Sequence, residues 1–236
     1  MNSSAMDLAR LDGRLRDLLG PDARAVAIAF VGQLPDGVDH VGRAVPSGCT
    51  FWKLAAEGQV FYTDPADHYG CPVGAHTHGL PPGPDGGASL TEMVRTMVGL
   101  EYLRESEVPD IPTLVGGFRH AVYAPLAAAP VAPDVVILRG SARRMMVAAE
   151  AARAAGIEGS APVRERPTCA VIAQVIQSGR AQPSFACVGN RVYTGLGEGE
   201  VYFAVPGARL EAFIDKLAAV TAANQALEAF HRARLE

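Results

Sequence analysis

Four cysteines are the residues of this chain whose chemistry is most specific. They are Cys49, Cys71, Cys169 and Cys187, and each is flanked by small or turn-forming residues. Small neighbours let a metal ion or a cluster approach the backbone closely. In a reducing compartment four cysteines are more typical of thiols or metal ligands than of two disulfides. The cysteines are therefore candidate ligands for zinc or for an iron–sulfur cluster.

The spacing of the cysteines favours one of these metal sites over the other. Nothing in the chain matches C-x₂-C, the short chelate that is typical of structural zinc. Iron–sulfur clusters accept dispersed thiolates, and the Cys71-Pro72 step is similar to the end of a ferredoxin ligand run. We therefore expect an iron–sulfur cluster of the 4Fe-4S type, held by three or four of the cysteines. Buried cysteines that act only as small apolar residues are the alternative.

The segment 67–79 gathers most of the other polar candidates. It holds three histidines, an aspartate and a tyrosine among glycines and a proline, and this composition predicts a loop shaped around a site. His68 and His78 are candidate acid–base residues, and Gly74 is a candidate cofactor contact. His76 and His78 are two residues apart, so on an extended segment both would face the same way. A zinc-dependent hydrolase that uses these two histidines and a cysteine is therefore a further possibility.

A second polar segment follows Cys187. Arg191 could hold a carboxylate or phosphate through paired hydrogen bonds, and Tyr193 is a second candidate for catalysis. Asn190 and Gly189 are expected to contact the cofactor. A metal-free module that binds a small anion through Arg191 and the glycine-rich loops is the main alternative to a cluster enzyme.

Composition excludes several other classes of protein. The net charge of −4 and the absence of a basic block give no support for binding nucleic acid or a membrane surface. No apolar run approaches the roughly 20 residues of a membrane helix, and the first residues lack the apolar run of a signal peptide. The P-loop, G-x-S-x-G and H-E-x-x-H patterns are all missing. We expect a cytoplasmic protein that acts on a small molecule by redox or sulfur-group chemistry.

The hydrophobic pattern predicts one α/β domain over residues 1–236, with α+β as the variant, built on a mixed sheet with flanking helices. The helices expected are 6–19, 49–57, 89–100, 141–155, 169–179 and 208–234. The strands expected are 25–31, 60–63, 121–126, 135–138, 191–196 and 201–205, with a hairpin turn at 197–199. The last helix could serve a homodimer as readily as the core.

Two parts of the chain, 23–107 and 120–235, repeat the same order of features. Each has a cysteine, a short helix, a glycine, an extended segment, a second cysteine in a glycine-rich loop, and later an amphipathic helix. This order predicts two similar halves whose cysteine pairs meet at one interface.

Several runs of residues carry a resemblance to a known family. They are Gly48-Cys49, Phe51-Trp52, Ala55–Gly58, Phe61–Thr63, Asp67–Ala75, Met97–Leu100, Arg166–Cys169 and Cys187–Leu196. In this order, over nearly the whole chain, they resemble the domain-of-unknown-function family numbered 169, found in bacteria and archaea. The resemblance implies a single domain, and the family name implies no activity. His76 stands where the family motif has an aromatic residue, which weakens a paired role for His76 and His78.

Overall fold

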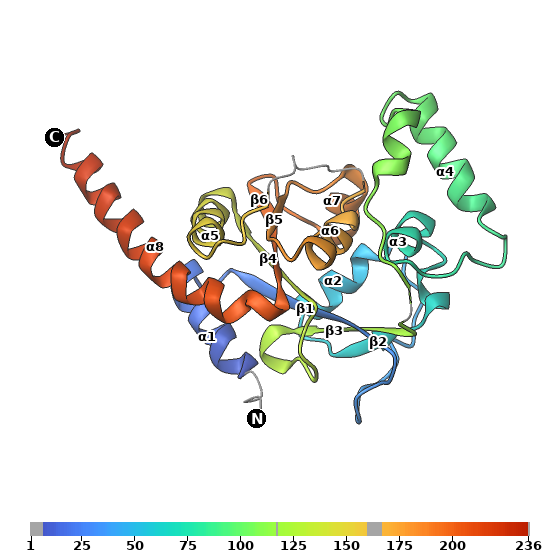
Figure 1. Cartoon of the computed structure of the whole chain (residues 1–236), viewed down its shortest axis with the longest axis horizontal. Coiled ribbons are helices and arrows are strands. Elements are labelled where there is room, and N and C mark those ends of the chain that lie inside the picture. Colours follow the sequence, from blue (N-terminus) through green and yellow to red (C-terminus); the bar gives the residue numbers. More distant parts are fainter. Residues whose placement is uncertain (1–6, 117, 160–166, 236) are drawn as a thin grey trace.

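The computed structural model describes residues 7–116, 118–159 and 167–235 (Figure 1). Arg166 of the family motif lies outside these residues. The helices are α1 (Leu8–Leu19), α2 (Cys49–Ala56), α3 (Pro72–Thr77), α4 (Ala88–Gly99), α5 (Ala142–Ala154), α6 (Ala170–Ser178), α7 (Val188–Thr194) and α8 (Leu210–Arg232). The strands are β1 (Arg24–Val31), β2 (Phe61–Thr63), β3 (His120–Pro125), β4 (Val135–Ser141), β5 (Gln182–Ser184) and β6 (Glu200–Pro206). Short 3-10 turns include η1 (Pro65–His68) and η2 (Glu105–Asp110).

The six strands form one sheet in the order β2-β3-β1-β4-β6-β5. The mixed α/β architecture with flanking helices that the sequence predicts is confirmed. The five strand pairs are all antiparallel, so the sheet is antiparallel and not mixed as expected. Parallel pairing is seen at two isolated bridges, His40 with Tyr62 and Glu158 with Ala181.

The strand order is symmetric about the β1–β4 pair. In each half the first strand is central, the second is at the edge and the third lies between them. By this symmetry β3 (His120–Pro125) belongs with β1 and β2, although it falls within the predicted second half 120–235. The internal repeat itself stays a prediction.

Alternating side chains of the central strands supply two separate cores. Ala27 and Val136 face a core with α1, α5 and α8, where Phe203 stacks on Phe213 at a centroid distance of 6.2 Å. Ile28 and its neighbours on the other face pack with α2 and α6. Figure 1 shows these two groups of helices on opposite sides of the sheet. Strands buried on both faces explain the nearly continuous apolar runs in the sequence.

The predicted strand 191–196 and the hairpin after it are wrong, because residues 188–194 form helix α7. Cys187 is its N-cap, and Gly195 ends it in the left-handed conformation at φ 64°. Inside the helix, the Thr194 hydroxyl donates to the Asn190 carbonyl at 2.8 Å. These two side chains are buried. Burial and capping therefore outweigh the strand preference of valine, tyrosine and threonine.

The predicted loop 67–79 is also partly wrong, because η1 and α3 occupy most of it. Pro72 is the first residue of α3, a position where the missing N–H of proline costs nothing. Cys71 is the N-cap and His78 the C-cap. Gly79 then turns the chain away at φ 64°.

Helix α4 and the turns after it form an excursion beyond the sheet (Figure 1). None of the residues of α4 is buried, and the helix lies against α3. Within the described part of the chain, no helix has the length and apolar character needed to cross a membrane.

A glycine substitution tests the turn that ends α3. A β-carbon at Gly79 would lie 2.1 Å from the Leu114 carbonyl oxygen, whereas one at Gly156 would meet nothing within 4 Å. Both residues have a left-handed φ, so each alanine variant carries a strain of about 1–2 kcal/mol. We expect Gly79→Ala to lower the free energy of unfolding by at least about 3 kcal/mol, because the collision adds to that strain. Urea denaturation measures both variants, and equal losses would contradict this account.

Candidate functional site

All four cysteines lie at the start of a helix. Cys49 is the first residue of α2, and Cys71, Cys169 and Cys187 are the N-caps of α3, α6 and α7. Each half contributes two of these helices. The unpaired N–H groups at a helix N-terminus favour negative charge, so each position favours a thiolate once the proton can leave.

The structure brings the four cysteines together. A β-carbon at Gly74 would lie 2.8 Å from the Cys71 sulfur and 4.0 Å from the Cys169 sulfur, so this glycine separates thiols from the two halves. The pKa of Cys49 is raised to about 12 by burial, with smaller contributions from Cys71 and Cys187. The pKa of Cys169 is raised well above its usual value, again mainly by burial and then by the other three cysteines.

Among the described residues, no three histidine, cysteine, aspartate or glutamate side chains are arranged to hold a single metal ion. Sulfurs around one tetrahedral zinc must each lie about 2.3 Å from it. In an iron–sulfur cluster each thiolate binds a different iron. The described residues therefore show no preformed site for a single zinc ion.

Hydroxyl groups from neighbouring residues surround the thiols, and sequence reasoning missed them. The Ser47 hydroxyl donates to the Cys71 sulfur at 3.5 Å. The Thr168 hydroxyl accepts a hydrogen bond from the Cys187 backbone N–H at 2.5 Å. Thr77 lies beside Cys169, and its side chain lowers the pKa of that thiol, which opposes the increase caused by burial. A signal was present, because Ser47 and Thr168 each stand within two residues of the first cysteine of their half.

His68 is buried with one ring nitrogen bound and the other free of partners. Its Nε2 lies 2.9 Å from the Thr63 hydroxyl, which itself donates to the Ala121 carbonyl. Because the Thr63 hydroxyl gives its proton to Ala121, its oxygen accepts a hydrogen bond from His68. The His68 proton is therefore on Nε2, and Nδ1 is an acceptor. Among the described residues Nδ1 has no hydrogen-bond partner. A β-carbon on Gly48, next to Cys49, would lie 3.6 Å from Nδ1.

His78 is also buried, and neither ring nitrogen has a partner in the described part of the chain. Its ring packs edge-on against Phe30 and His68, at centroid distances of 5.4 and 5.7 Å. Burial lowers the pKa of His78 to about 4. Burial also lowers the pKa of His68 to about 3, with a smaller effect from His78.

The expectation that His76 and His78 face the same way is wrong. The segment is helical, and residues two apart on a helix point to different sides. His76 is exposed and lies 3.4 Å from the Thr113 hydroxyl, whereas His78 is buried. The two rings therefore do not share a site.

Asn190 connects α7 to the thiols. Its backbone N–H donates to the Cys187 sulfur at 3.4 Å, and its side chain is buried. The carboxamide lies near enough to Cys49 to lower the pKa of that thiol against the effect of burial. Its Nδ2 meets no partner within hydrogen-bond geometry among the described residues. Gly189 is on the same helix, and among the described residues a β-carbon there would come within 4 Å of Tyr193 alone, at 3.8 Å.

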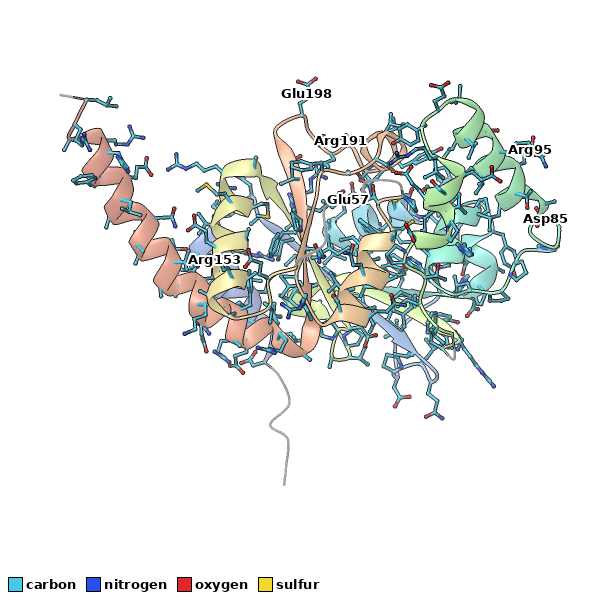
Figure 2. The ribbon with its side chains drawn as sticks, turned by 45° about the horizontal axis from the view of Figure 1, so that its top comes forward. Glu57, Asp85, Arg95, Arg153, Arg191 and Glu198 are labelled. Atoms are coloured by element: carbon cyan, nitrogen blue, oxygen red, sulfur yellow. The ribbon has the colours of Figure 1, made fainter. Side chains whose placement is uncertain are left out.

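The Arg191 side chain is held by hydrogen bonds to the protein backbone. Its guanidinium donates to the backbone carbonyls of Phe185, Gly197 and Glu200 at 2.7–3.2 Å, and Figure 2 places it among the segments around α7. Arg191 is thus a positioning residue for the helix that carries Asn190. Tyr193 of α7 is 42% exposed.

Comparisons with known proteins give one match. The family model described as DUF169, uncharacterised ArCR, matches residues 14–216. No curated protein and no solved structure matches the chain.

The buried histidines predict a stability that depends on pH in the metal-free protein. In the unfolded chain both histidines titrate near 6.5, but in the folded protein only near 3 and 4. The unfolded state therefore binds more protons between these values. The free energy of unfolding should be highest above pH 6.5 and should fall as the pH drops toward 4. Each histidine contributes a slope of up to about 1.4 kcal/mol per pH unit.

The variant His78→Phe tests the contribution of one ring. We expect it to reduce this slope by up to about 1.4 kcal/mol per pH unit, because the titrating group is gone. Urea denaturation at several pH values measures the slope. The matched control is His231→Phe on the exposed end of α8, which should leave it unchanged. A His78→Phe protein with the original slope would refute the assignment.

Proposed function

We propose that this chain, which belongs to the DUF169 family, binds an iron–sulfur cluster through its four cysteines and acts as an enzyme on a small molecule. One observation carries the proposal: Gly74 lies between the sulfurs of Cys71 and Cys169, which come from different halves. The other two thiols are near enough to raise the pKa of Cys169. A convergence of four thiols has no comparable use in an apolar core, where each could be replaced by alanine or valine.

The surroundings of the thiols fit a bound cluster. Cys49 and Cys169 are buried and stay protonated without metal, because burial disfavours their charged form. Metal binding releases those protons and supplies the positive charge that the buried thiolates need. The buried Asn190 amide and the Ser47 hydroxyl are donors at hand for sulfur, and hydrogen bonds to sulfur tune the potential of such clusters.

Cys49, Cys71, Cys169 and Cys187 would hold the cluster. When bound, the group supplies electron transfer, or Lewis-acid chemistry at one iron if only three cysteines ligate. The residues of the chain have distinct roles: Phe51 and Tyr123 exclude water from the inner side, and Arg191 fixes the loops around α7. His68 Nδ1 offers a hydrogen-bond acceptor beside Gly48 and Cys49.

Exposure supports an enzyme over a purely structural centre. Cys71 and Cys187 are half-buried, whereas Cys49 and Cys169 are buried. The centre is therefore reached from the side of α3 and α7, and a small molecule would approach there. The two other functions considered from the sequence gain no support, because Arg191 is engaged by backbone carbonyls and His76 points away from His78.

The first test is the cofactor content of protein purified without oxygen. We expect a brown protein with broad visible absorbance and with iron and acid-labile sulfide in similar amounts. Single Cys→Ser variants at the four positions should each lower iron and sulfide at least severalfold, because serine is a poor ligand for the cluster. A colourless protein that stays metal-free after reconstitution, or four serine variants with full iron content, would refute the proposal.

A pair of glycine variants tests the geometry. Gly74→Ala places a methyl group 2.8 Å from the Cys71 sulfur, so we expect it to lose most of its iron and sulfide. Gly189→Ala puts the same methyl group in ordinary contact with Tyr193 at 3.8 Å and should keep the full cluster. Its free energy of unfolding should also be higher, by up to about 1 kcal/mol, because alanine has a higher helix propensity than glycine. Equal iron content in the two variants would contradict the placement of the cluster beside Gly74.

A further inference from the structure

A cavity lies beside α3, and its lining includes Pro167, two residues before Cys169. It has a volume of about 280 Å³ and lies between α3, α4 and the segment that follows α4. Its lining is mostly apolar, with Leu90, Val94 and Met97 of α4 facing Val73 of α3. Because residues 73 and 76 of α3 face this cavity and residue 74 faces the sulfurs, helix α3 is a wall common to both sites.

The apolar residues that α4 contributes to this lining are unusual for their position. Helix α4 has no buried residue, although an amphipathic helix of twelve residues needs its apolar side covered to be stable. Figure 2 shows Arg95 of α4, and Asp85 in the loop before α4, on the outer side of this region, away from the sheet. The apolar side faces α3 and the cavity instead. The apolar side of α4 therefore lines a cavity that could hold an apolar group.

Two polar groups mark one end of the cavity. His76 and Thr91 line it together with Leu90, and the same three residues also line a wider neighbouring cavity of about 570 Å³. The wider cavity is walled by a proline- and glycine-rich segment over residues 80–87. A molecule could thus place an apolar body against α4 and a polar end at His76, where the two cavities meet.

We propose that this cavity binds a small amphipathic molecule with a hydrocarbon chain or ring body and one polar end. An apolar cavity of about 150 Å³ is enough to bind benzene in another protein, so about 280 Å³ suits a chain of six to eight carbons or two fused rings. The proposal does not depend on the cluster, because none of the four cysteines lines the cavity.

The test uses protein labelled with ¹³C on the methionine methyl groups and 1-hexanol as the probe. Met97 lines the cavity, whereas Met93 is one turn earlier on α4, is 41% exposed and does not line it. We expect hexanol to shift the Met97 signal in a saturable manner and to leave Met93 nearly unchanged. The matched probe 1,6-hexanediol should bind at least about tenfold more weakly, because its second hydroxyl would lose water in the apolar end.

Two variants distinguish the cavity from general surface binding. Val94→Trp fills the cavity and should abolish the saturable shift, whereas Val98→Trp on the next turn, outside the lining, should keep it. Met145, a buried residue of α5 in the core, reports that each variant is folded. Iron and sulfide content should be the same in both variants. Failure of the cavity proposal can therefore be distinguished from failure of the iron–sulfur proposal. No saturable shift, or equal binding of hexanol and hexanediol, would overturn the proposal.

Discussion

The burial of thiols at helix N-termini is the constraint on which the rest of this structure depends. Cys49 and Cys169 are surrounded by apolar side chains that raise their pKa, and such an environment is costly for any charge. The four helix starts that converge there are stable together only if the thiols remain neutral or a cation compensates them. The sheet supplies the rigid base that holds the helices against each other at this point.

The unpartnered polar atoms concentrate in the same region. Asn190, His68 and His78 each bury at least one nitrogen that has no partner among the described residues, and a folded protein rarely tolerates several such groups close together. Stability alone would favour apolar side chains at these positions. Groups of this kind are common at functional sites.

Sequence reasoning found the cysteines, the main helices and the central strands, because apolar periodicity over long segments is a strong signal. It failed at α3 and α7, where Pro72, Gly74 and Gly189 have the composition of a loop. These helices are short, and their N-caps are cysteines, which are not among the usual capping residues. The roles of Ser47 and Thr63 were missed because each depends on a partner distant in sequence. The pairing of strands likewise depends on contacts that no local pattern encodes.

The two outermost strands, β2 and β5, are only three residues long, and β5 contains Pro183. Long, flat edge strands are templates on which other chains can add, whereas short edges and proline prevent this. The sheet is thereby protected from edge-to-edge aggregation even though its central strands are strongly apolar. The same shortness has a second effect. Because each edge strand is so short, the chain turns back toward the first cysteine of its half soon after the strand. The two cysteines of each half are therefore only about twenty residues apart in sequence.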